Sequence, residues 1–173
     1  SPSAPSSAAA SPSASASPSA SPSGAAASPG ARTVQVYAID GGFQNLPIDP
    51  TPGTILTFRN VGSEAHELVL LRRNDDATDK QTFDDILADP TKLDPAALMK
   101  FVTVVGALAA DPGAEATGQI ELTQPGTYLA IDLLPKGTAT APASPDPMAV
   151  PSGVPNAASG MVGTFNVIEP EAS

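Results

Sequence analysis

The sequence has no cysteine and no tryptophan, and only 4% of its 173 residues are aromatic. The absence of cysteine excludes disulfides, thiolate metal ligands, iron–sulfur clusters and thiol nucleophiles. The few aromatic side chains mean that any core must be mainly aliphatic. Because 41% of the residues are hydrophobic and only 15% are charged, the composition still favours a packed domain over a disordered chain.

Basic residues are also scarce, with 8 Lys and Arg against 18 Asp and Glu and a net charge of −10. No basic stripe is present to neutralise phosphates, so we do not expect nucleic-acid binding. No apolar run approaches the roughly 18 to 20 residues needed to span a bilayer. The sequence starts without Met and without a hydrophobic leader, which is typical of a trimmed mature segment.

The first segment, residues 1–31, consists almost entirely of Ser, Ala, Pro and Gly. Such a composition cannot bury enough surface to offset its ordering entropy, so we predict a disordered tether with a span of roughly 30 Å. It is similar to the stretch that follows a lipid-modified cysteine in bacterial exported proteins, which implies an extracytoplasmic protein, either secreted or held at the cell envelope by a lipid upstream of Ser1. An ordinary interdomain or glycosylated linker is the alternative.

After this segment, short stretches with alternating apolar and polar residues are separated by Pro and Gly, which is typical of half-buried strands. We expect one domain over residues 32–170 and a short tail at 171–173. Six or seven short strands with turn signals between them predict an all-β antiparallel sandwich or barrel. The expected strands cover residues 33–40, 54–60, 66–72, 117–122, 126–132 and 162–168.

Two segments interrupt the strand pattern. Residues 74–111 contain TFDDILAD and DPAALMKF, whose spacing predicts short helices, and Asp94-Pro95 is a good start for one of them. We therefore expect a mainly helical insertion at about 74–111 that packs over the sandwich or presents an apolar patch to a partner. Residues 135–159 carry six prolines and are expected to form a long irregular loop.

The order of three motifs resembles the cupredoxin family, in particular the plastocyanin/azurin-like domains of exported bacterial proteins. The motifs are TFRNVGSEAHELVL, QPGTYLAID and GMVGTFNVI, and the resemblance covers about residues 33–168. It implies a Greek-key β-sandwich. It also implies a type 1 copper site built from two His, one Cys and one Met.

Two of these four ligand positions match the family. His66 corresponds to its first His and Met161 to its axial Met, whereas the Cys position holds Asp132 and the second His position holds Asn156. Blue-copper chemistry depends on a short copper–thiolate bond, which an aspartate cannot provide. The resemblance therefore implies a degenerate copper site, and a blue-copper electron carrier is excluded.

Two hypotheses follow for the function. The first is a non-enzymatic binding or structural module without a cofactor, in which His66 hydrogen-bonds Asp132 or Asn156 and whose protein or small-ligand partner at the cell envelope is unknown. The second is a protein that binds copper or another divalent ion through His66, Asp132, Asn156 and Met161, helped by Met148. Convergence of these side chains within coordination reach would favour the second hypothesis, and their separation the first.

Other chemistry has little support in the sequence. Ser63 and two glutamates lie near His66, but no oxyanion hole is indicated, so we expect no catalytic residues. The acidic run Asp75, Asp76, Asp79, Asp84 and Asp85 lacks the spacing and the glycine of a calcium loop, which favours a solvated helix surface over a calcium site.

Overall fold

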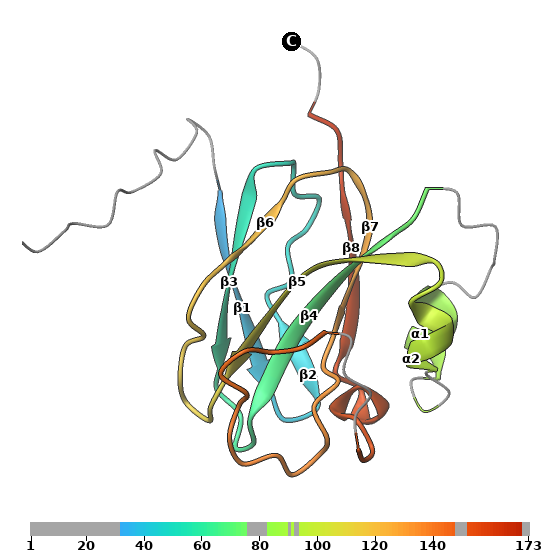
Figure 1. Ribbon diagram of the computed structural model, residues 1–173. Coiled ribbons are helices and arrows are strands. Elements are labelled where there is room, and N and C mark those ends of the chain that lie inside the picture. The colour runs from blue at the N-terminus through green and yellow to red at the C-terminus, as the bar shows by residue number, and fades with distance from the viewer. Residues whose placement is uncertain (1–31, 76–82, 90, 92–93, 148–151, 171–173) are drawn as a thin grey trace, which may run out of the picture.

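The computed structural model describes residues 32–75, 83–89, 91, 94–147 and 152–170 (Figure 1). The predicted tether at 1–31, the tail at 171–173 and Met148 lie outside these residues. Two four-stranded sheets face each other, with strand orders β2-β1-β3-β6 and β5-β4-β7-β8. The structure thus confirms the predicted all-β, cupredoxin-like β-sandwich.

The first sheet is built on β1 (Thr33–Ile39) and β3 (Thr54–Asn60), which pair in parallel. Two three-residue strands flank them, β2 (Gly42–Gln44) and β6 (Ile120–Leu122). Alternate residues of β1 and β3 are buried, as the period-two pattern predicts. The strand β2 was not expected, because three residues are too few to show a periodic pattern.

The second sheet contains β5 (Val102–Ala110), β4 (His66–Arg73), β7 (Gly126–Ile131) and β8 (Val162–Val167), with antiparallel neighbours. The inner faces of both sheets form the main core, around Leu56, Phe58, Leu68 and Tyr128. Tyr128 stacks on Phe165 with ring centroids 5.5 Å apart, so two of the few aromatic side chains anchor this core.

A second hydrophobic cluster lies on the outer face of the second sheet, under α1 (Phe83–Ala88) and α2 (Pro95–Leu98). Phe83, Ile86 and Leu98 from the helical segment pack against Val69 and Leu129 of the sheet. Figure 1 shows the helices beside this sheet, outside the sandwich. Because β4 is covered on both faces, its first six residues are all buried, which explains its nearly continuous apolar sequence.

The helical insertion is shorter than the predicted range of about 74–111. The helices end at Leu98, and residues 102–110 form the nine-residue strand β5. This segment contains Val102, Thr103, Val104 and Val105, and such β-branched side chains favour strands. The apolar stretch therefore belongs to the sandwich itself, not to a patch on an inserted helix.

The predicted Pro-rich loop follows β7 and is irregular over its described residues up to the 3-10 helix η2 (Asn156–Ser159). An isolated bridge joins Pro135 to Pro155, and Asn156 N donates to Leu134 O at 2.9 Å. These contacts close the base of the loop. They also fix Asn156 beside the end of β7.

Among the described residues, no helix is both long enough and apolar enough to span a membrane.

Candidate functional site: a buried His–Asp–Asn centre

Three of the four predicted site residues converge at one end of the sandwich. His66 begins β4, Asp132 directly follows β7, and Asn156 begins η2. All three are buried, with exposed fractions of 1%, 0% and 3%. Residues 66 and 156 are 90 positions apart in sequence, so only the folded chain brings them together.

Both oxygens of Asp132 accept hydrogen bonds. Its Oδ2 accepts from His66 Nδ1 at 2.8 Å and from Asn156 Nδ2 at 3.1 Å, and its Oδ1 accepts from the backbone N–H of Leu134 at 2.9 Å. The two side-chain donors point at the same oxygen, which places Asn156 Nδ2 and His66 Nδ1 3.4 Å apart. Asp132 is therefore the acceptor around which this centre is organised.

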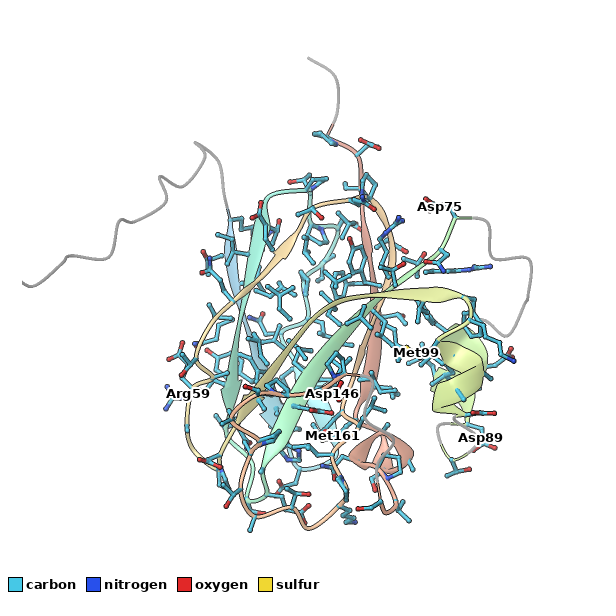
Figure 2. All side chains as sticks on the ribbon, in the orientation of Figure 1. Arg59, Asp75, Asp89, Met99, Asp146 and Met161 are labelled. Carbon is cyan, nitrogen blue, oxygen red and sulfur yellow. The ribbon has the colours of Figure 1, made fainter. Side chains whose placement is uncertain are left out.

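Met161, the fourth predicted residue, is held next to the centre by its backbone. Met161 O accepts from Asp132 N at 3.1 Å, and Met161 N donates to Asn156 O at 3.3 Å. Its fully buried side chain belongs to the hydrophobic core between the sheets. Figure 2 shows Met161 at the same end of the sandwich as η2.

Asp40 completes the centre and was not anticipated from the sequence. It follows β1, and its Oδ1 lies 3.2 Å from His66 Nε2. Ser63 N and Ser63 Oγ donate to its two oxygens at 2.8 Å and 2.6 Å. These bonds from Ser63, together with the bond from His66, lower the pKa of Asp40 to about 2, so its carboxylate is charged at neutral pH. The only sequence signal was an Asp-Gly-Gly turn after a strand, which does not indicate a contact with His66.

Both ring nitrogens of His66 face a carboxylate oxygen, Asp132 at Nδ1 and Asp40 at Nε2. Burial raises the pKa of Asp132, while its bonds from His66, Leu134 N and Asn156 lower it. With both carboxylates ionised, each contact is a hydrogen bond only if that ring nitrogen carries a proton, so the two contacts together favour the imidazolium form. Burial by itself lowers the pKa of His66. The hydrogen bonds and charges of Asp132 and Asp40 outweigh it and raise the pKa above its ordinary value of 6.5.

Glu67 is a second buried acid next to this centre, on the opposite face of β4 from His66. It is 3% exposed, and its Oε1 accepts from Leu133 N at 3.1 Å. Burial, together with the smaller effects of the charges of Asp132 and Asp146, raises the pKa of Glu67 to about 7. The sequence identifies Glu67 only as a neighbour of His66. Its burial follows from the covering loop.

The donor set does not fit a type 1 copper ion. The chain has no thiolate, and Asp132, which the sequence resemblance places at the cysteine position, uses both oxygens in hydrogen bonds within the protein. Among the described residues, no group of three or more His, Cys, Asp or Glu side chains is arranged to hold a metal ion. In the same residues, every buried side-chain nitrogen and oxygen has a hydrogen-bond partner, so the polar groups satisfy one another.

The fold and the centre together define a cupredoxin-like β-sandwich domain without the cysteine of a blue-copper site. No protein-family model and no curated protein sequence matches the chain.

Solved structures similar to this chain include three auracyanins. Reduced auracyanin from the photosynthetic bacterium Roseiflexus castenholzii is 20% identical, with 80% of this chain and 99% of that chain covered and a TM-score of 0.44. Auracyanin B is 18% identical, with 80% and 89% covered and a TM-score of 0.41. Auracyanin A, described as a "blue" copper protein from Chloroflexus aurantiacus, is 15% identical, with 80% and 100% covered and a TM-score of 0.40. Values this low do not assign the chain to their family.

The contact between Asp40 and His66 depends on the small size of Gly62. A Cβ at this position would clash with Asp40 Oδ1 and would lie 3.0 Å from His66 Nε2. We expect Gly62→Ala to displace Asp40 and to lower the free energy of unfolding by about 1 to 3 kcal/mol, the usual cost of overpacking. Urea unfolding measures the change. Gly42→Ala is the control, because a Cβ there meets nothing within 4 Å, and an equal loss in both variants would contradict the prediction.

Proposed function

We propose that this chain is a non-enzymatic, exported, cupredoxin-like binding or structural module in which a protonated histidine takes the place of the copper ion. The observation that carries the proposal is the pair of carboxylates on His66, with Asp132 at 2.8 Å and Asp40 at 3.2 Å. The imidazolium supplies positive charge where the family has a metal ion. Asn156 supplies a further donor to Asp132 in place of the second histidine.

A metal-binding function is the second candidate, because His66, Asp132 and Asn156 do converge. Convergence was the feature expected to favour it. However, these side chains form hydrogen bonds with one another. A metal ion would therefore have to displace a proton from His66 and break the hydrogen bonds to Asp132. One imidazole, one carboxylate, one amide and one thioether are also a mixture of hard and soft ligands that no common metal strongly prefers.

Calorimetric titration of the whole chain with Cu(II), Cu(I) and Zn(II) at neutral pH separates the two candidates. The proposal predicts no saturable one-to-one binding that depends on the centre. The matched variants are His66→Gln, which removes the imidazole, and Met161→Leu, which removes the thioether while preserving the core volume. One-to-one binding that is lost in both variants would overturn the proposal in favour of a metal site.

The extracytoplasmic location is part of the same proposal. It is supported by the composition of residues 1–31, which is similar to the segment that follows the lipid anchor of exported bacterial proteins. Mass spectrometry of the protein purified from its native membrane and soluble fractions tests this. Recovery of an unmodified protein from the cytoplasm would contradict it.

A further inference from the structure

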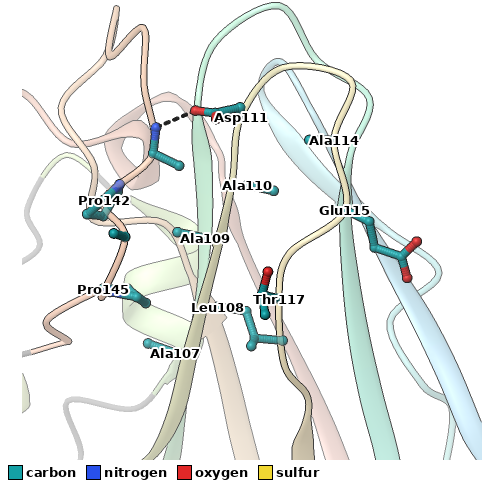
Figure 3. A pocket seen from close by; sticks show the side chains of 12 residues that line it. Ala107, Leu108, Ala109, Ala110, Asp111, Ala114, Glu115, Thr117, Pro142 and Pro145 are labelled. Carbon is teal, nitrogen blue, oxygen red and sulfur yellow. Dashed lines mark hydrogen bonds between the residues drawn. The ribbon is translucent and has the colours of Figure 1, made fainter. Parts of the chain in front are cut away.

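A groove lies along the outer edge of β5, on the side of this strand that faces away from β4. Its volume is about 310 Å³, and it is lined by residues 107–111 of β5 and its end, by residues 114, 115 and 117, and by residues 141–143 and 145. Figure 3 shows β5 between these two loops, with Glu115 on one side and Pro142 and Pro145 on the other. A hydrogen bond from Ala141 N to Asp111 Oδ1, 2.7 Å long, holds the proline-rich wall in place.

The floor of the groove is an open strand edge. β5 is the outermost strand of its sheet and pairs with β4 alone. Outside that pairing, no backbone hydrogen bond joins residues 106–109 to another described segment. In an antiparallel pair, alternate residues direct their N–H and C=O groups away from the partner strand, so this edge offers unpaired donors and acceptors to an added strand.

The walls determine what can reach this edge. Loops stand on both sides of the exposed part of β5, so a second sheet, as in edge-to-edge pairing of two copies, would collide with them. A single extended chain is narrower and can lie between the loops. The floor and walls consist mainly of Ala and Pro, and the volume of about 310 Å³ suits a short extended segment with small side chains facing the groove.

The charged residues that line the groove are of one sign. Asp111 and Glu115 line it, no Lys or Arg does, and Asp146 follows directly after the lining residue Pro145. The whole chain carries a net charge of −10, so the field around the groove attracts cations and repels anions. This complementarity selects among extended segments.

From these observations we propose that the groove binds an extended, positively charged peptide segment of a partner protein by adding it as a strand to the free edge of β5. Backbone hydrogen bonds to β5 supply affinity, and alternate small side chains of the peptide fit the Ala-lined walls. Residues 107–110 cover about 10 Å of strand, so the groove takes four or five residues of the peptide. The proposal specifies the partner of the proposed binding module and rests on that function.

The test is a titration of the full chain at low ionic strength with three synthetic decapeptides, in which Ala alternates with Lys, with Glu or with Ser. Calorimetry gives the affinities, and amide NMR shifts locate the binding. We expect the Lys peptide to bind, with shifts centred on residues 106–110, and the Glu peptide not to bind. Added salt is expected to weaken binding, because the attraction is partly between exposed charges.

Two variants with matched controls locate the site. Ala109→Lys fills the floor of the groove, and Thr103→Lys makes the same charge change at an exposed position of β5 outside it. Glu115→Lys reverses a wall charge at an exposed position, and Glu121→Lys does so on β6, outside the groove. We expect each groove variant to weaken binding by about tenfold or more, and each control by less than about threefold.

Several results would overturn the proposal. The proposal fails if the Lys peptide does not bind, or if the Glu peptide binds as tightly as the Lys peptide. It also fails if a groove variant and its control lose the same affinity for the Lys peptide. Tighter binding of the Ser peptide would point to the Ser- and Ala-rich residues 1–31 of this chain as the occupant instead. A dimer that Ala109→Lys dissociates would point to a second copy. No residue of the His66 centre lines the groove. A failure of the peptide proposal would therefore leave the result of the metal titrations unchanged, and the two tests can fail separately.

Discussion

Replacing Glu67 with glutamine is expected to stabilise the protein at about pH 8 by up to about 3 kcal/mol and to leave its stability at about pH 4 nearly unchanged. The reason is the pKa of about 7 for the buried carboxyl, against an ordinary value of 4.5. Glutamine keeps an oxygen that accepts from Leu133 N but carries no charge at any pH.

The direction of the effect follows from proton binding. Below pH 4.5 Glu67 is protonated in both the folded and the unfolded chain, so it adds no pH dependence there. Between 4.5 and 7 the folded chain holds this proton and the unfolded chain releases it, so the free energy of unfolding falls as the pH rises. Above about pH 7 Glu67 is ionised in both the folded and the unfolded chain, and the free energy of unfolding falls no further because of this residue.

Urea unfolding of the wild type and of Glu67→Gln from pH 4 to pH 8 measures this effect. The wild type should lose stability over that range, and the variant should lose less. Because the pKa of His66 is also raised, its stabilisation is lost as the pH rises through the folded-state value, so the variant should keep part of the slope. Glu121→Gln, at an exposed position of β6, is the control. An unchanged slope in Glu67→Gln would contradict the prediction.

Removing Asp132 is expected to be the most destabilising single change at the centre, with a loss of about 3 to 5 kcal/mol in Asp132→Ala, the usual cost of breaking a buried ion pair. The variant removes the carboxylate that accepts from His66 Nδ1, Asn156 Nδ2 and Leu134 N. An unpaired buried polar group keeps its full desolvation cost, which is why the loss exceeds that of a single hydrogen bond.

Asp75→Ala is the matched control, because it also removes an aspartate from an ion pair. Its partner is Arg72 at 3.0 Å, but the Asp75 side chain is 83% exposed, whereas that of Asp132 is 0% exposed. Exposed pairs contribute little to stability. A double-mutant cycle with His66→Gln measures the coupling between His66 and Asp132. Similar losses in Asp132→Ala and Asp75→Ala, or a negligible coupling, would show that the centre is not held by this pair.

Much of the fold could be read from the sequence. The alternation in TVQVYAID and TILTFRN predicts strands with one buried face, and the structure has them as β1 and β3. The error came at Val102–Ala110, where the apolar run was assigned to the helical insertion. Short apolar runs do not distinguish a buried strand from a buried helix by periodicity, and here the pairing with β4 decides the conformation.

The centre could be predicted in part. The positions of His66, Asp132 and Asn156 came from the motif order, and the structure places them in contact. Asp40 and Glu67 could not be found in this way. Asp40 lies 26 residues before His66 and meets it because the segment after β3 returns to the end of β1. Glu67 is buried by the loop that begins at Leu133.

By itself the sequence determined what this protein cannot be. A chain without cysteine cannot form the copper–thiolate bond of a blue-copper protein, whatever its fold, because that bond is a property of the side chain. The arrangement of the His66 centre was decided by the tertiary structure. The charge of His66 and the pKa of Glu67 depend on how deeply these side chains are buried and on how far they lie from other charged groups. These distances and this burial exist only once the two sheets have packed together, because the groups come from the ends of β1 and β7, from β4 and from η2.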